Sequence, residues 1–461
     1  MTSTSSGSSP RRPLARRSVL AGALAAAGAG LAACAPGSSG PSGGASSSAP
    51  VSTDAASLGD VTLAVWDQNT DEGINAAQEK LNAAFMAAYP NITVERTVRS
   101  FDDLKTTLRL ALSGDVAPDV VQANQGYPDM GAFVQAGLLQ SLNPWADAYG
   151  WTKRYPADLL SLNRFSADGA TWRDGDLFGV SQTGEMVGVY YDKAVLARAG
   201  VQPPTTMDEF TASLPTILAA GELPIQYGDA DKSPGIHLFG VALATMAGAK
   251  AAGALVSGAG GAWTDPAVVA AATALQQWAQ AGYLPAGHNG VAEDDAVARF
   301  GQGQGAYMLN GTWQLATLQA ALGADVGFTA LAGTGGTPET LGGIGLAWAV
   351  SAKTANANAA AAYVDFLTNA AAGQVLVDTG NLPAVFPEGY TAPAGTLAGD
   401  VATSWQAVSQ GGGLVPYLDY ATPTFYDTLT AGIQQLTGGR QDPQQFTEAL
   451  QADDAAFRKG A

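Results

Sequence analysis

Apolar and polar positions in the first part of the chain switch between the spacing of strands and that of helices. Short apolar runs and a two-residue alternation predict three strands, at residues 61–66, 92–98 and 119–122. Apolar residues that recur every three or four positions predict three helices, at residues 74–88, 104–112 and 129–136. This order predicts an α/β fold whose parallel or mixed sheet carries helices on both faces.

The later part of the chain predicts a second region of the same kind. Strands at residues 186–191 and 306–309 accompany helices at residues 265–281 and 293–300. The acids that open the last helix, residues 293–295, are interpreted as partners of the helix dipole, because carboxylates favour a helix N-terminus.

Trp313 is the candidate aromatic contact for a ligand. Asn310-Gly311 predicts a turn after the short strand, so Trp313 would stand at the mouth of a sheet. A Trp in that place can offer its flat face to a ligand, or it can simply seal the end of a strand.

The loops that follow the first strands carry amide groups next to aromatic rings. Ligands of parallel α/β sheets bind beyond the carboxyl ends of the strands, where Trp66, Asn124 and Gln125 are expected. Amides hydrogen-bond paired hydroxyls, and rings cover the apolar face of a sugar, so these loops suit a polyhydroxyl ligand. Each of these residues could instead only cap a turn.

Glu185 is the second candidate contact, since it enters an otherwise apolar strand. A carboxylate there must find a partner, which can be a ligand hydroxyl, a backbone amide or an Arg. The polar loop at residues 229–237 could reach the same ligand site. Tyr and Phe residues are concentrated at residues 417–426.

Composition and charge limit the classes of protein to which the chain can belong. The chain has 461 residues with 47% hydrophobic and 13% charged residues, enough for two or three globular domains. There are 40 Asp and Glu against 22 Lys and Arg. Four of the basic residues precede Cys34, and without them the net charge would be near −22. Such a surface repels nucleic acid and anionic lipid, so neither is an expected partner.

The first residues predict export. Arg16-Arg17 precede a short apolar run at residues 19–31, which has the form of a signal sequence and is too short to span a membrane comfortably. Leu-Ala-Ala-Cys ending at Cys34 resembles the bacterial lipobox, which implies a signal peptide at residues 1–33 and a lipid anchor on Cys34. The alternative is an ordinary secretory signal with an incidental Cys. Residues 34–57, rich in Ser, Gly and Ala, are expected to form a flexible linker. The expected location is the extracellular face of the cytoplasmic membrane.

Several kinds of catalytic chemistry lack their residues. Two His and a single Cys do not assemble a usual zinc site, and the chain has neither a G-x-S-x-G elbow nor a Walker A loop. No cofactor is therefore expected. A glycosidase needs only two facing carboxylates, and 40 acids leave that open.

One stretch resembles the extracellular solute-binding protein family 1, the maltose-binding-protein-like receptors of ABC sugar importers. The family segment reads F-x-x-G-x-x-A-M-x-x-x-G-x-W, and the matching residues here are Phe300, Gly303, Ala306, Gly311 and Trp313. Tyr307 stands where the family usually has Met. Further weak matches occur in the family's order, at residues 118–121, 137–139, 204–210 and 378–383.

The resemblance implies a two-lobed periplasmic-binding-protein fold (type II-like), with crossover hinge strands near residues 179–185, 342–344 and about Pro393. Lobe one would comprise residues 58–181 and 342–394, and lobe two residues 182–341 and 395–461. The protein would be a monomeric receptor rather than an enzyme, and would deliver a carbohydrate to the membrane subunits of an ABC permease after hinge closure.

The resemblance also implies roles for the candidate residues. Trp313 would stack on a sugar ring, the amides and Glu185 would bind hydroxyls, and Gly343 would donate its backbone N–H. The full expected set is Trp66, Asn124, Gln125, Glu185, Trp313, Gly343 and Tyr426. Two rivals stay open: a receptor of the same fold for a polyamine, a peptide or another non-sugar solute, and a secreted glycosidase.

Overall fold

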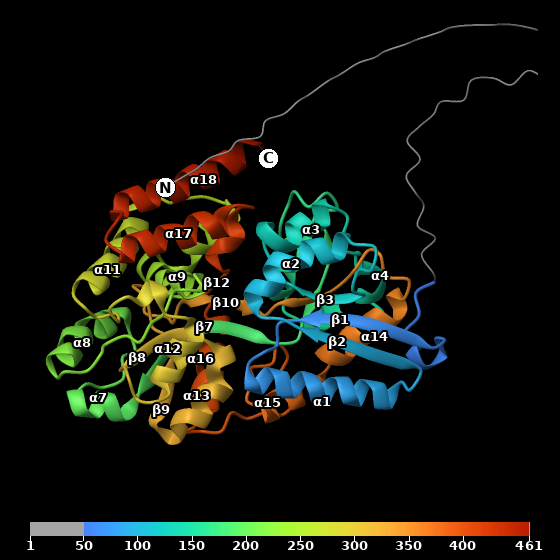
Figure 1. Ribbon diagram of the computed structural model, residues 1–461, viewed down its shortest axis with the longest axis horizontal. Coiled ribbons are helices and arrows are strands. Elements are labelled where there is room, and N and C mark those ends of the chain that lie inside the picture. Colours follow the sequence, from blue (N-terminus) through green and yellow to red (C-terminus); the bar gives the residue numbers. More distant parts are fainter. Residues whose placement is uncertain (1–49, 461) are drawn as a thin grey trace, which may run out of the picture. The chain divides into compact units, whose positions relative to one another are not determined.

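The computed structural model describes residues 50–460, which build two mixed β-sheets flanked by helices (Figure 1). The predicted signal peptide, Cys34 and the linker residues up to 49 lie outside the described residues. Of the predicted linker, residues 50–57 are described. They contain the short 3-10 helix Ala55–Ser57, and the Ser52 backbone N–H donates to the Asn358 side chain over 3.1 Å.

The first sheet has the order β2-β1-β3-β11-β6. Its strands are β1 (Val61–Asp67), β2 (Ile92–Val98), β3 (Val120–Ala123), β6 (Val180–Ser181) and β11 (Ala347–Val350). β1 pairs in parallel with β2 and β3, whereas β11 runs antiparallel to β3 and β6. The sheet is mixed, which is one of the two arrangements, parallel or mixed, that the pattern of strands and helices predicts.

The second sheet has the order β12-β10-β7-β8, and β9 also pairs with β7. Its strands are β7 (Gly184–Asp192), β8 (Tyr307–Gly311), β9 (Val326–Thr329), β10 (Thr340–Ile344) and β12 (Leu414–Val415). A separate two-stranded ribbon consists of β4 (Arg164–Phe165) and β5 (Asp176–Leu177).

β7 shows how the apolar pattern fixes both faces of the second sheet. Met186 and Tyr190 are fully buried in one core cluster, while Val187 and Val189 are fully buried in another. Successive strand residues point to opposite faces, so a strand that is apolar throughout is buried on both sides.

Helices cover both sheets. The longer ones are α1 (Glu72–Ala88), α2 (Phe101–Ser113), α8 (Met207–Ala219), α9 (Ser233–Ala247), α10 (Ala249–Ser257), α11 (Pro266–Gln280), α12 (Glu293–Phe300), α13 (Leu315–Leu322), α14 (Ala357–Thr368), α15 (Ala370–Asp378), α16 (Leu397–Gln410), α17 (Phe425–Thr437) and α18 (Pro443–Gly460). The shorter ones are α3 (Ala132–Gln135), α4 (Asn143–Ala146), α5 (Trp151–Arg154), α6 (Ala157–Ser161) and α7 (Lys193–Ala199). Short 3-10 or π turns are η2 (Tyr127–Gly131), η3 (His288–Gly290), η4 (Thr312–Gln314), η5 (Gly323–Asp325) and η6 (Leu418–Ala421).

The chain passes between the sheets at points that lie side by side. Residues 182–183 connect β6 to β7, and residues 345–346 connect β10 to β11. The Gly345 N–H donates to the Thr183 carbonyl over 2.9 Å, and Thr183 also forms a β-bridge with Pro383, between α15 and α16. We call the part built on the first sheet the first lobe and the part built on the second sheet the second lobe.

Two local features differ from the sequence analysis. The expected boundary at residue 342 falls inside β10, because residues 342–344 pair with β7 and the chain joins the first sheet only at Ala347. Asn310 and Gly311 do not form a turn, since they extend β8 by pairing with Gly188 and Val187. Pairing with the long strand β7 outweighs the local turn preference, and the Gly311 N–H donates to the Asn310 side chain over 2.7 Å.

No helix within residues 50–460 has both the length and the apolar content needed to cross a membrane.

The ion pair between Asp67 and Arg96 should contribute strongly to stability. The Asp67 carboxylate accepts from the Arg96 guanidinium over 2.6 and 2.7 Å, and its side chain is fully buried. Removing one partner of a buried pair leaves an uncompensated charge, so Asp67→Asn should lower the free energy of unfolding by about 3 kcal/mol in urea denaturation. The exposed pair of Arg198 and Glu222 offers a control, because Glu222→Gln should change stability little. Equal effects of the two substitutions would contradict this assignment.

Candidate functional site

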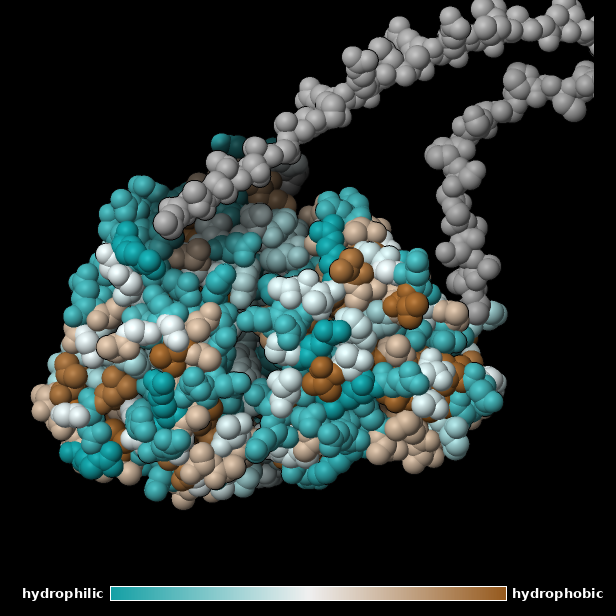
Figure 2. Space-filling view, in the orientation of Figure 1, coloured by the Kyte–Doolittle hydropathy of each residue, from teal (hydrophilic) through white to brown (hydrophobic). Residues whose placement is uncertain are grey.

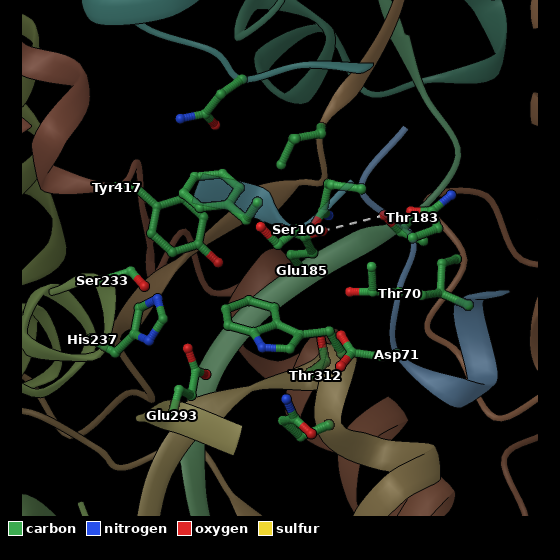
Figure 3. A pocket seen from close by; sticks show the side chains of 18 of the residues that line it. Thr70, Asp71, Ser100, Thr183, Glu185, Ser233, His237, Glu293, Thr312 and Tyr417 are labelled. Atoms are coloured by element: carbon green, nitrogen blue, oxygen red, sulfur yellow. Dashed lines mark hydrogen bonds between the residues drawn. The ribbon is translucent and has the colours of Figure 1, made fainter. Parts of the chain in front are cut away.

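A cavity of about 340 Å³ lies between the two lobes. In Figure 2 the surface is hollowed between the two lobes, and mainly hydrophilic residues border the hollow. The residues that line the cavity are mostly polar, acidic or aromatic, and Figure 3 shows several of them facing it.

The first lobe lines the cavity with loops at the carboxyl ends of its parallel strands. The loop after β1 supplies residues 68–71, and the end of β3 supplies Gln122 and Asn124. These segments are joined because the Gln122 side chain accepts from the Gln68 N–H over 2.9 Å and donates to the Asn69 side chain over 3.1 Å. The edge of the sheet is therefore the expected one for a ligand site.

The second lobe lines the cavity with the start of β7, the start of α9, the start of α12 and the aromatic segment around η6. Its residues are Gly184, Glu185, Asp231, Ser233, Ile236, His237, Ala292, Glu293, Asp294, Thr312, Trp313, Gln314, Tyr417, Asp419, Tyr420 and Tyr426. The segment at residues 229–237 does reach the cavity, through Asp231, Ser233, Ile236 and His237.

Four of the seven predicted contact residues line the cavity: Asn124, Glu185, Trp313 and Tyr426. Trp313 is half-buried and packs against the His237 ring, with ring centroids 5.2 Å apart. The indole lies so close over Gly311 that a Cβ at that position would overlap its six-membered ring. Gly311 is needed for this close approach rather than for a special backbone angle. Ligand contact by these four residues stays a prediction.

Trp66 and Gln125 do not line the cavity, for different reasons. The Trp66 ring lies under the Arg99 guanidinium, 4.2 Å from the ring centroid, which makes it part of a surface cation–π contact. Gln125 is fully buried, and its amide donates to the carbonyls of Ile344 and Gly345 over 3.1 and 2.8 Å. Gln125 therefore ties the first lobe to the crossing strand.

Gly343 does not line the cavity either. It pairs with Glu185 in the ladder between β10 and β7, and a Cβ at its position would lie 2.6 Å from the Leu162 side chain. Its backbone is engaged in the sheet, while the neighbouring crossing residue Leu346 lines the cavity.

The sequence analysis missed most of the acids of the site. Glu293 and Asp294 were interpreted as partners of the helix dipole, yet both line the cavity, as does Asp71 at the N-cap of α1. The N-terminus of α12 lies at the cavity, but the sequence pattern reveals only that a helix begins there. The acidic residues at helix starts were the one available signal.

Burial raises the pKa of the cavity carboxyls. Desolvation is the main cause for Glu185 and Glu293, whose pKa rises to about 7, and for Asp71 and Asp419, whose pKa rises to about 6. Neighbouring carboxylates add to the shift: Asp71 acts on both Glu185 and Glu293. The cavity therefore concentrates groups that resist carrying their full negative charge.

The two lobes also touch through polar contacts at one side of the cavity. The Tyr420 hydroxyl lies 3.0 Å from the side-chain oxygens of both Asn124 and Gln125, and its single proton serves one of them at a time. Lys105 of α2 pairs with Asp129 over 2.5 Å and lies 4.5 Å from the centre of the Tyr426 ring. These contacts hold the loop after β3 against η6, and α2 against α17.

A two-sheet α/β structure, whose chain crosses repeatedly between the sheets and encloses a polar and aromatic cavity, defines a two-lobed solute-binding protein. The sequence agrees, since the bacterial extracellular solute-binding protein family matches residues 68–374. The chain belongs to this family.

Individual relatives support the same class. The chain is 26% identical over 337 residues to the Multiple sugar-binding protein of Streptococcus mutans, covering 70% of this chain and 74% of that protein. The fold is similar to that of a chitin oligosaccharide binding protein, with a TM-score of 0.73, 23% identity and coverage of 87% of this chain and 99% of the other. It is also similar to the raffinose complex of the solute-binding protein RafE, with a TM-score of 0.68, 20% identity and coverage of 86% and 99%.

The raised pKa values predict how stability depends on pH. In the unfolded chain Glu185 and Glu293 lose their protons near pH 4.5, whereas in the folded protein they keep them up to about pH 7. The folded state binds more protons in this interval, so its stability falls as the pH rises through it. In thermal scans between pH 5 and 8 without ligand, Glu185→Gln with Glu293→Gln should reduce the fall in Tm. An unchanged fall would show that these groups are not desolvated.

Proposed function

We propose that this protein is the extracellular receptor of an ABC importer and that it captures a carbohydrate in the cavity between its lobes. The observation that carries the proposal is the combination of the half-buried Trp313 ring with carboxyl and amide groups from both lobes around one cavity. An aromatic ring covers the apolar face of a sugar, and carboxyl and amide oxygens accept from its hydroxyls. The name of the relative from Streptococcus mutans supports the same ligand class.

Capture would proceed by hinge closure. The chain crossings at residues 182–183, 345–346 and around Pro383 lie beside one another, so the lobes can change their angle with little change inside either sheet. A ligand that touches both lobes favours the closed form in proportion to the contacts made only there. The permease would then bind the closed, loaded receptor, and a lipid on Cys34 would keep the receptor at the membrane.

A thermal-shift screen of the purified protein tests the ligand class. The panel contains monosaccharides, oligosaccharides, polyols, amino acids, peptides and polyamines. A ligand that binds only the folded protein raises Tm, and more so the further its concentration exceeds Kd. We expect a shift with saccharides, with the sugar recovered intact by chromatography. A shift with only peptides or polyamines would overturn the carbohydrate assignment, and loss of the sugar would favour the glycosidase.

Trp313 should dominate the affinity for the saccharide found in that screen. Trp313→Ala removes the stacking surface and should weaken binding at least tenfold in calorimetry, about 1.4 kcal/mol. Gly311→Ala should also weaken binding, because the added Cβ displaces the indole without removing it. Gly59→Ala is the control, since nothing lies within 4 Å of a Cβ there. Unchanged affinity in Trp313→Ala would remove this residue from the site.

A further inference from the structure

Three carboxyls in the cavity have only other acids as charged neighbours. Asp71 comes from the first lobe, and Glu185 and Glu293 come from the second. The charges that act on them belong to each other and to Asp231 and Asp294. No Lys or Arg stands among the residues that line the cavity within the described part of the chain.

The other side of the cavity is different, because its acids have cations nearby. Lys105 lowers the pKa of Asp419 against the effect of burial, and Lys105 and Lys232 both act on Asp102. Lys105 also pairs directly with Asp129. The protein thus supplies counter-charges on the side of α2, and leaves the group of Asp71, Glu185 and Glu293 without one. We call this group the acidic subsite.

Hydrogen bonding within the acidic subsite is also incomplete. Glu293 accepts from the Asn310 amide over 2.9 Å, and Glu185 accepts only a long bond from Thr183, at 3.4 Å. Asp71 is an N-cap residue whose side chain makes no capping bond to its helix. Carboxylates with spare acceptor capacity at a cavity are suited to donors that arrive with a ligand.

A second observation points independently to a bound molecule. The Tyr417 side chain is only 8% exposed and lines the cavity, yet its hydroxyl has no hydrogen-bond partner among residues 50–460. The Nδ1 atom of His237, a residue 7% exposed, is also without a partner there. In Figure 3 Tyr417 and His237 come from the same side as Glu293 and face the cavity, while Asp71 faces it from the opposite side. Buried polar groups without partners are rare, and a polar ligand that reaches these two atoms when the lobes close would satisfy them.

Closure of the lobes would increase the electrostatic repulsion among the carboxyls of the acidic subsite. Asp71 lies on the lobe opposite Glu185 and Glu293, so approach of the lobes brings like charges together while water leaves. A neutral sugar accepts and donates hydrogen bonds but brings no counter-charge. Within residues 50–460 no group of three His, Cys, Asp or Glu side chains forms a metal site, so nothing described there points to a metal as the counter-charge.

We propose that the ligand is an amino sugar or a similar amino polyol, whose protonated amine binds in the acidic subsite between Asp71, Glu185 and Glu293. The inference rests on the proposed function, which it narrows from carbohydrates to cationic ones. The sugar ring would lie on Trp313, the ammonium group would donate to carboxylates of both lobes, and the Tyr417 hydroxyl would bond a ring substituent. Ammonium–carboxylate hydrogen bonds are roughly twice as strong as neutral ones, and here they also remove the repulsion across the cleft.

Matched sugar sets test this in calorimetry at pH 7. Each set holds the free amine, the N-acetylated amine and the parent sugar: glucosamine, galactosamine and mannosamine with their N-acetyl and hydroxyl counterparts, and chitosan oligosaccharides with the corresponding chitin oligosaccharides. Spermidine serves as a cation without a sugar ring. We expect at least one free amine to bind ten times more tightly than both of its counterparts, and the difference to shrink in high salt.

Variants locate the amine. Glu293→Gln should weaken binding of the free amine at least ten times more than it weakens binding of the neutral counterpart, and Asp71→Asn should do the same. Glu72→Gln is the matched control, because Glu72 is the exposed neighbour of Asp71 in the first turn of α1 and does not line the cavity. Tm of each variant without ligand shows that it folds.

The outcomes separate the two proposals. If neutral sugars bind as tightly as their amines, the inference is overturned and the carbohydrate receptor stands. If no sugar of any set binds, the inference is overturned, and the wider saccharide panel of the thermal-shift screen then decides the proposed function. If spermidine binds tightly and no sugar binds, both the inference and the proposed function are overturned, because the site would then recognise a cation without a sugar ring. Equal losses in Glu293→Gln and Glu72→Gln would move the amine away from the acidic subsite.

Discussion

The structure depends on the place where the chain crosses between its two sheets. The crossing residues are bonded to one another: Gly345 donates to the Thr183 carbonyl, and Gly184 donates to the Leu382 carbonyl over 3.0 Å. The Ser181 hydroxyl donates to the Gly345 carbonyl over 2.5 Å, and the buried Gln125 amide donates to the same oxygen. Backbone groups that leave one sheet without yet joining the other need such partners, because they are buried. These bonds tie the two sheets together at the crossing, which is where the proposed hinge motion would occur.

This crossing also places the site. Glu185 is the second residue of β7 and therefore lines the cavity directly beside the crossing. A change in the angle between the lobes would change the surroundings of its carboxyl. A Cβ at Gly345 would overlap the Thr183 hydroxyl and the Glu185 carboxyl, so a larger residue there would displace both side chains. The chain thus holds a carboxyl beside the crossing, in a place where desolvation raises its pKa. A desolvated carboxyl with a raised pKa lowers the stability of the folded protein above neutral pH. Such a loss of stability is typical of residues that have a role in binding.

The fold was predictable because its signals are local and periodic. The first three strands and helices follow from apolar spacing, and the fold class follows from their order and from the motif that ends at Trp313. The site was only partly predictable. Asn124, Glu185, Trp313 and Tyr426 line the cavity, but the orientation of Trp66 depends on Arg99, and the burial of Gln125 depends on carbonyls 219 and 220 residues away. Glu293 reads as a helix start in the sequence, and only the packing of the two lobes makes it part of a cavity.

The uneven charge of the cavity bears on how an empty receptor differs from a loaded one. On the side of α2, Lys105 pairs with Asp129 of its own lobe and contacts the Tyr426 ring of the second lobe. On the side of the acidic subsite, Asp71 acts on carboxyls of the other lobe, and no Lys or Arg of residues 50–460 lines the cavity. If the lobes close as proposed, the repulsion there would raise the free energy of an empty closed form relative to the open one, and the proposed bound cation would reverse its sign. A ligand shifts the equilibrium between the open and the closed form only by its difference in affinity for the two forms. A positive charge on the ligand that interacts strongly with both lobes only in the closed form would supply such a difference. Binding of the ligand would then favour closure.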